Sequence, residues 1–187
     1  MQNARIAKYS SLLTAMLLIF LGLSSGLGYV RLSLIIGSFL AFTIVIMVVS
    51  VRHHFKPSIY GTLAIVFIAI YAVLISSNYF IQLSAIFRDA PLLNTMDMSS
   101  PLSVFWMIEI LGYFFMGMST ICLSELFKEG PFARPIRILL ILNGFLGLGG
   151  VLGYWLNWGN DLMLAGLLSW NIVVPIAAFL IFLRFRK

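Results

Sequence analysis

Residues Ile59–Phe87 read IYGTLAIVFIAIYAVLISSNYFIQLSAIF and contain no charged residue. The length of this stretch, about 29 residues, corresponds to roughly 44 Å of α-helix, against a bilayer core of about 30 Å. The stretch therefore predicts a transmembrane helix that tilts strongly or projects beyond the membrane surface.

The composition of the whole chain agrees with a membrane location. Of its 187 residues, 61% are hydrophobic and only 10% are charged, whereas soluble proteins average about 25% charged residues. These charges are too few to cover a water-exposed surface, and apolar runs take up almost the whole sequence. We therefore expect residues 1–187 to form a single transmembrane domain, with no separate soluble domain.

Six apolar runs have lengths close to the roughly 20 residues that a bilayer core requires. These runs are Ser10–Tyr29, Leu32–Val51, Ile59–Phe87, Leu102–Glu125, Ile136–Asn157 and Leu162–Leu183. Between them, Arg31 marks a tight turn, Pro57 suits the first turn of a helix, and Gly130 is expected to end the fourth helix. The fold class predicted is all-α, an integral-membrane six-helix bundle.

The distribution of basic residues predicts the orientation of this bundle. If all six runs cross the membrane, only Arg31 and Arg88 among the 12 Lys and Arg residues fall on one side, and the other ten fall on the opposite side. Cytoplasmic loops of membrane proteins carry such an excess of Lys and Arg. Both termini are therefore expected in the cytoplasm.

The net charge of +6 does not indicate a nucleic-acid partner, because the basic residues lie at the ends of apolar runs, where they set topology and contact anionic lipid. The expected partners are the lipid bilayer and a small solute or cation. Self-association or a partner membrane protein stays open. The single cysteine, Cys122, lies within an apolar run and is expected to be a buried, inert thiol.

The polar residues within the spans fall at a common depth in the outer half of the membrane. Glu109, the one acid well inside a span, lies roughly 11 Å below the outer boundary, and Asn171 lies roughly 13 Å below it. Asn78 and Gln82 are four residues apart on one helix face, and Ser25, with its neighbour Ser24, lies in a similar band. This agreement predicts a polar pocket formed by four helices.

Two local features strengthen the prediction of a pocket. Pro175 lacks an N–H group, so the carbonyl of Asn171 loses its helical partner and a kink is expected there. Tyr113 lies one helical turn after Glu109 and could hydrogen-bond its carboxyl group. No Lys, Arg or His occurs deep within a span, so Glu109 is expected to be protonated unless water or a cation reaches it.

The same polar layer has a structural interpretation. Buried polar side chains often tie membrane helices together, at about 0.6 kcal/mol per hydrogen bond. Arg31 or Arg88 could also extend down to form an ion pair with Glu109. A binding pocket and a purely structural layer are both retained.

Glycines and aromatic residues at other positions have structural interpretations. Gly22 and Gly26, one turn apart, predict close packing against a neighbouring helix. A glycine cluster predicts the same for the fifth span: Gly144, Gly147, Gly149, Gly150 and Gly153. The aromatic residues near the outer ends of the spans predict an interfacial belt; they are Tyr29, Tyr79, Trp106, Trp155 and Trp158.

Several membrane chemistries lack the residues they need. Haem and intramembrane zinc sites need histidines within spans, and both histidines, His53 and His54, lie in a basic turn that is expected to be solvated. A retinal-type chromophore needs a lysine within a span, and a membrane serine protease needs a histidine or lysine beside its serine. We therefore expect no cofactor, no metal and no catalytic residue, and an enzyme resting on Glu109 is the least favoured function.

Three stretches resemble uncharacterised prokaryotic multi-pass membrane proteins, a family whose domain has no known function. These stretches are Asn78–Gln82, Pro101–Trp106 with Glu109, Gly112 and Tyr113, and Trp170–Asn171 with Pro175. The resemblance implies the cytoplasmic membrane of a bacterium or archaeon, and it implies no activity.

The favoured function is therefore binding or transport of a small solute or cation. The binding residues expected for it are Glu109, Asn78, Gln82, Tyr113, Asn171 and Ser25. The alternative function is that of an accessory, sensory or scaffold subunit.

Overall fold

The computed structural model describes residues 2–88, 103–156 and 169–186. Within these ranges every regular element is a helix and no strand occurs, which confirms the all-α prediction. The elements are α1 (Gln2–Gly26), α2 (Val30–His54), α3 (Ile59–Phe87), α4 (Val104–Ser124), α5 (Ala133–Trp155), the π-helical turn η2 (Ser169–Val173) and α7 (Val174–Arg184). Five of them, α1 to α5, are long and apolar enough to cross a membrane.

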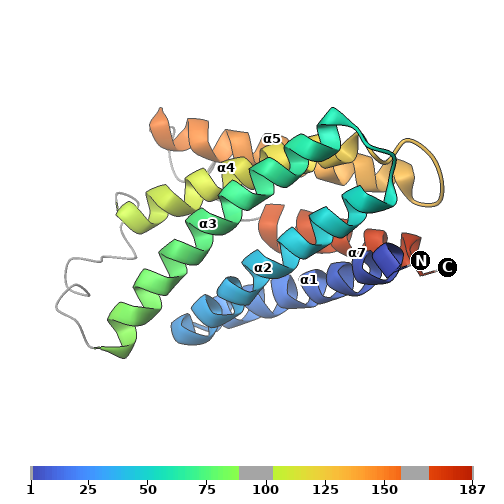
Figure 1. The fold of residues 1–187 in the computed structure, drawn as a ribbon. Helices are drawn as coiled ribbons and strands as arrows, with labels where there is room; N and C mark the ends of the chain where they lie inside the picture. The colour runs from blue at the N-terminus through green and yellow to red at the C-terminus, as the bar shows by residue number, and fades with distance from the viewer. Residues whose placement is uncertain (1, 89–102, 157–168, 187) are drawn as a thin grey trace.

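The helices form a closed ring. From α1 to α5, each helix packs against the next one in the chain, and α7 packs against both α1 and α5 (Figure 1). The two termini lie side by side at one end of the molecule, together with the turn that joins α2 to α3. A ring of this kind encloses an interior that six elements can line.

The outer surface of the ring is apolar. Val73, Phe80 and Trp155 expose 67%, 71% and 72% of their surface, and many other large hydrophobic side chains are exposed beside them. Such an extensive apolar surface is unusual for a water-soluble monomer. It is the surface that a multi-pass membrane protein presents to lipid.

The positions predicted for Arg31, Pro57 and Gly130 at the helix ends were wrong, and α1 is longer than the first apolar run. α1 begins at Gln2 rather than Ser10, because the polar residues before the apolar run continue the helix. The first turn is centred on Gly28, whose φ of 78° is in the left-handed region that favours glycine, so Arg31 lies inside α2. Pro57 precedes α3, whose N-cap is Ser58, and α4 ends at Ser124, before Gly130.

The last apolar run is described only in part. Its predicted range was Leu162–Leu183, and residues 157–168 lie outside the described part of the chain, as does Leu102 at the predicted start of the fourth run. The described part begins with η2 and continues as α7, with Pro175 in the first turn of α7. The kink predicted at Asn171 therefore takes the form of a π-helical turn, which is one way for a helix to accommodate a missing backbone donor.

Close packing by glycine occurs between α4 and α5. A Cβ atom on Gly117 would lie 3.1 Å from the carbonyl oxygen of Gly144, and one on Gly147 would lie 2.9 Å from that of Tyr113. Only a residue without a side chain permits this backbone approach. The packing predicted for Gly144 and Gly147 is thus confirmed. At Gly150 it was wrong, because a Cβ atom there would meet nothing within 4 Å.

The carboxyl-terminal end of the chain closes the ring through Arg184. Its guanidinium group donates hydrogen bonds to the carbonyl oxygens of Glu129 and Pro131, at 2.7 and 3.1 Å. The ring of Phe185 meets that of His54 edge to face, with centroids 4.8 Å apart. His54 thus contacts an aromatic ring and is also exposed, which agrees with the predicted solvated turn.

Candidate functional site

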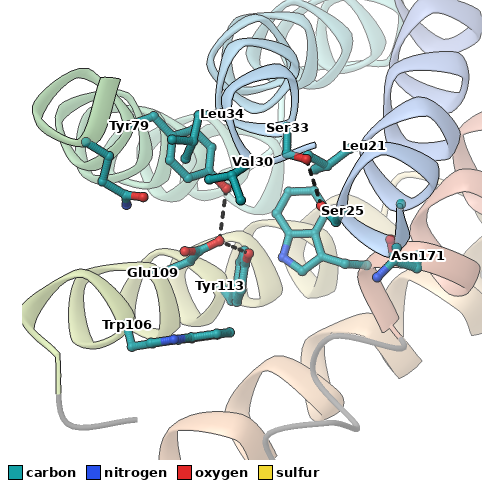
Figure 2. Close-up of a pocket in the computed structure, with 14 residues that line it drawn as sticks. Leu21, Ser25, Val30, Ser33, Leu34, Tyr79, Trp106, Glu109, Tyr113 and Asn171 are labelled. Carbon is teal, nitrogen blue, oxygen red and sulfur yellow. Dashed lines mark hydrogen bonds between the residues drawn. The ribbon is translucent and has the colours of Figure 1, made fainter. Parts of the chain in front are cut away.

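Glu109 on α4 receives two hydrogen bonds from tyrosine hydroxyl groups. The hydroxyl group of Tyr79, on α3, donates to Glu109 Oε1 at 2.9 Å, and that of Tyr113 donates to the same oxygen from one turn further along α4. Figure 2 shows the carboxyl group between the two phenol rings. Two donors on one oxygen leave the second oxygen, Oε2, with no hydrogen bond to any other described residue.

The position of Tyr79 corrects its assignment to the interfacial belt. Only 7% of this residue is exposed, because its ring lies against Gly37 on the neighbouring helix α2. A Cβ atom on Gly37 would lie 2.3 Å from an edge carbon of the Tyr79 ring. The absence of a side chain at Gly37 therefore lets the Tyr79 ring point inward to Glu109.

Asn78 and Gln82 share a face of α3 and are both buried, but they differ in function. Asn78 Nδ2 donates to the carbonyl oxygen of Phe105 at 3.2 Å, which joins α3 to the first turn of α4. Gln82, one turn later, lines the cavity beside Glu109. The structure therefore places Asn78 in a helix–helix contact and not in the lining of the pocket.

Asn171 reaches the same cavity from η2, on the opposite side of the ring. Its side chain lies against α1 at Gly22, where a Cβ atom would be 2.7 Å from Asn171 Oδ1. Gly22 thus makes room for a polar side chain, whereas a Cβ atom on Gly26 would meet nothing within 4 Å. The prediction that Gly22 and Gly26 form one packing surface was therefore wrong at Gly26.

Serine residues form the rim where α1 meets α2. Ser33 Oγ lies 2.9 Å from Ser24 Oγ, and Ser25 Oγ donates to Ser33 Oγ at 3.2 Å. Ser25 and Ser33 both line the cavity (Figure 2). The hydroxyl groups are thus already paired with one another on this side.

These side chains surround a cavity of about 530 Å³. Its volume falls in the range of about 300–1,000 Å³ that is typical of small-molecule sites. The described lining combines glycines, aliphatic residues, aromatic residues and polar residues. These residues are Leu21, Gly22, Ser25, Gly26, Val30, Ser33, Leu34, Tyr79, Gln82, Trp106, Glu109, Tyr113, Trp170 and Asn171. Five of the six predicted binding residues are in this set, and Asn78 is not.

Two buried polar atoms in the cavity lining have no hydrogen-bond partner. They are Gln82 Oε1, an acceptor, and Trp170 Nε1, a donor; their residues are 2% and 5% exposed. Buried polar groups in folded proteins are almost always paired with protein atoms or water. Neither atom has surface accessible from the cavity, so the two residues line it through their other atoms, and a partner in the cavity would pair with them only after the side chains turn toward it.

A second buried polar cluster shows what a purely structural arrangement looks like. Asn143 on α5 donates through Nδ2 to Thr120 Oγ1 on α4 and accepts through Oδ1 from Ser169 Oγ on η2, each at 2.9 Å. None of these side-chain atoms lacks a partner, and none of the three residues lines the cavity around Glu109. This cluster joins three elements and is internally satisfied.

No basic side chain neutralises Glu109 within the described ranges. The one ion pair there joins Arg137 to Glu125, 2.7 Å apart, so Arg31 and Arg88 do not form the alternative ion pair with Glu109. The described part of the chain also contains no group of three or more His, Cys, Asp and Glu side chains that could hold a metal ion. Cys122 is a free, buried thiol, as expected from the sequence.

Aromatic rings supply much of the cavity wall. Trp106 and Trp170 both line it, and the Trp170 ring packs against that of Tyr113 with centroids 4.9 Å apart and planes at 71°. Sequence reasoning missed Tyr79, Trp170 and Ser33 and placed Trp106 in the interfacial belt. The available signal was that Tyr79 and Trp106 lie only three residues from Gln82 and Glu109, on adjoining faces of their helices.

Comparison with protein-family models, with curated proteins and with solved structures finds no match for this chain. The resemblance to prokaryotic multi-pass membrane proteins therefore gains no support from these comparisons.

Proposed function

We propose that this chain is a multi-pass protein of a prokaryotic cytoplasmic membrane that binds a small solute or cation in the cavity around Glu109 and takes part in its transport. In this proposal the chain crosses the membrane six times, and both termini are cytoplasmic. Glu109, Gln82, Tyr113, Asn171 and Ser25 contact the solute, together with Tyr79 and Trp170.

The proposed orientation is supported by charge and by the arrangement of the helices. The termini and the α2–α3 turn lie at one end of the ring, and ten of the 12 Lys and Arg residues belong to this end if the helices alternate. Since positive charge is retained on the cytoplasmic side, this end faces the cytoplasm. The Glu109 cavity then lies in the outer half of the membrane.

The observation that carries the binding function is the contrast between the two polar clusters. The Asn143 cluster pairs its polar atoms and lines no part of the Glu109 cavity. The Glu109 cluster borders about 530 Å³ of space and leaves Gln82 Oε1 and Trp170 Nε1 unpaired. The cavity is the feature that separates the two clusters, because unpaired buried polar atoms also occur outside its lining, for example Asn78 Oδ1 in the contact between α3 and α4.

The competing function, a scaffold or sensory subunit, is favoured by one observation. Tyr79 and Asn78 each join α3 to α4 through a hydrogen bond, so part of the polar layer also holds helices together. The two functions predict different effects of replacing Glu109: loss of the response to a ligand if the cavity binds a solute, and loss of thermal stability if the polar layer is structural.

A thermal-shift screen of the purified protein in detergent tests the proposal. The compounds are inorganic cations, amines, alcohols and small sugars, and the variants are Glu109→Gln and Asn171→Ala. A compound that binds the folded state raises the melting temperature with its concentration. We expect at least one to stabilise the native chain and to lose this effect in both variants.

The matched control is Glu125→Gln, which makes the same chemical change at the surface ion pair with Arg137. This variant should retain the response to the compound. If Glu109→Gln and Asn171→Ala instead lower the melting temperature and no compound stabilises the native chain, the polar layer is structural and the scaffold function is favoured.

A further inference from the structure

Among the described lining residues, the only full charge that the cavity can readily carry is the negative charge of the Glu109 carboxylate. Among the described residues that line the cavity, Glu109 is the only carboxylic acid, and none is Lys, Arg or His. Both tyrosine hydroxyl groups donate to Oε1, and hydroxyl donors stabilise a carboxylate through charge-assisted hydrogen bonds. Because Oε2 has no partner among the described side chains, a ligand with a positive charge would complement the site.

The walls of the cavity have the chemistry that binds organic cations. Tyr79, Trp106, Tyr113 and Trp170 come from three elements, α3, α4 and η2, and line one cavity. The faces of aromatic rings attract cations, with tryptophan the strongest, and cages of such rings recognise quaternary ammonium groups. An aromatic wall with a single carboxylate therefore favours a cation that also has apolar surface.

A bare metal ion fits this cavity poorly. Ca²⁺ takes six to eight oxygen ligands at short distances, and Mg²⁺ requires octahedral geometry. The described lining has one carboxylate, and the Ser25 and Ser33 hydroxyl groups already pair with each other. The cavity, at about 530 Å³, also exceeds by far the volume of one coordinated ion.

The two unpaired buried atoms concern the polar groups of the ligand. Gln82 Oε1 can accept a hydrogen bond from an ammonium N–H group or a hydroxyl group, and Trp170 Nε1 can donate to an oxygen atom. Both are nine-tenths or more buried. Neither atom has surface accessible from the cavity, so a ligand with an ammonium group and an oxygen substituent would satisfy them only after both side chains turn toward it.

We propose that the Glu109 cavity binds a small organic ammonium ion, with the charged nitrogen between the Glu109 carboxylate and the aromatic wall. This inference rests on the proposed function and specifies its class of solute. The cation contacts Glu109 Oε2, its apolar carbon atoms contact Trp106 and Trp170, and its polar substituent pairs with Gln82 or Trp170.

Choline and its uncharged analogue 3,3-dimethyl-1-butanol provide the direct test, because they share shape and hydroxyl group and differ in charge. Binding to the full-length protein in detergent is measured by isothermal titration calorimetry and by quenching of tryptophan fluorescence. The phenylethylammonium ion is the third probe, since it offers N–H donors, and sodium chloride is the fourth. We expect one of the two ammonium ions to bind at least about tenfold more tightly than the neutral alcohol.

The variants separate charge from aromatic contact. Glu109→Gln should weaken binding of the ammonium ion at least about tenfold and leave the neutral alcohol unaffected. Trp106→Leu should weaken it more than Trp106→Phe, which keeps an aromatic face. Glu125→Gln should bind like the native protein, and the melting temperature of each variant shows whether it is folded. If Glu109→Gln does not fold, the comparison of Trp106→Leu with Trp106→Phe still tests the proposal.

Each contrary outcome has a distinct meaning. Equal binding of choline and the neutral alcohol, lost in Trp106→Leu, would overturn the ammonium class and leave the cavity as a solute site. Ammonium binding unchanged in both Glu109→Gln and Trp106→Leu would place the ion elsewhere and overturn the proposal. No binding of either ammonium ion at millimolar concentration would also overturn it, while the broader thermal-shift screen decides on the proposed function.

Discussion

Around Glu109, hydrogen bonds and open space are unevenly distributed between the two carboxyl oxygens. Oε1 accepts from Tyr79 and Tyr113, whereas Oε2 has no partner among the described residues. The tyrosines hold the carboxyl group in one orientation, because each comes from a buried or half-buried position on a packed helix. The residue thus has a fixed geometry and one oxygen available to a ligand.

At this scale we predict that Tyr79→Phe lowers the free energy of unfolding by about 1–2 kcal/mol, since it removes a hydrogen bond to Glu109 and keeps the ring. The measurement is reversible unfolding in mixed detergent micelles. Tyr60→Phe is the control, because Tyr60 lies on the same helix and is 49% exposed. Equal stabilities of the two variants would show that the Tyr79 hydroxyl group contributes nothing to the fold.

Between helices, glycines decide where backbones meet and where side chains enter the interior. Gly117 and Gly144 bring α4 and α5 into contact, and Gly37 on α2 accommodates the ring of Tyr79 on α3. Gly22 on α1 does the same for Asn171. The positions of Tyr79 and Asn171 beside the cavity therefore each depend on a glycine of a neighbouring helix.

For the contact between α4 and α5, we predict that Gly144→Ala destabilises the protein by about 1–3 kcal/mol, the usual range for overpacking. The added Cβ atom would lie 2.2 Å from Ile121 and 2.9 Å from the Gly117 carbonyl oxygen. Gly150→Ala on the same helix meets nothing within 4 Å and should be neutral or slightly stabilising, because alanine favours a helix. Thermal unfolding of both variants tests this, and equal melting temperatures would contradict the described packing.

The sequence predicted the helices better than the faces they present. Ile59–Phe87 has the predicted bounds, because hydropathy and flanking charges limit an apolar run. The inward position of Tyr79 was not predictable, because an aromatic residue near a span end fits an interfacial belt equally well. Gly37 is the residue that allows the inward position of Tyr79 instead of an interfacial one. One sequence does not show which residue of α2 faces Tyr79. Asn143 was missed because its partners, Thr120 and Ser169, lie on other helices.

Over the whole molecule, the closed ring explains how residues from distant parts of the chain meet. α7 packs on α1 and α5, and η2 brings Trp170 and Asn171 to a cavity that also contacts α1, α2, α3 and α4. The exterior is apolar, and the interior combines a hydrophobic core with the polar lining of the cavity around Glu109.

The proposed orientation predicts a pattern of thiol labelling in intact cells. In a Cys122→Ala background, Leu27→Cys in the α1–α2 turn should react with a membrane-impermeant maleimide added outside. Lys56→Cys, in the turn between α2 and α3, should react only after the membrane is permeabilised. The opposite pattern would invert the topology, and external labelling of both sites would mean that α2 does not cross the membrane.

The central claim is that Glu109 borders a cavity accessible from outside the membrane, and its most direct test compares two positions on α4 at nearly the same depth. In a Cys122→Ala background, Glu109→Cys lies in the cavity lining, and Leu111→Cys lies on the outer apolar face, where Leu111 is 39% exposed. A trimethylammonium methanethiosulfonate reagent is added to intact cells, and modification is read by mass spectrometry. We predict that Glu109→Cys is modified and Leu111→Cys is not, because the charged reagent enters a polar cavity and not lipid. If Glu109→Cys stays unmodified in a folded protein, or if both positions react alike, Glu109 does not border a polar cavity that opens to the outside.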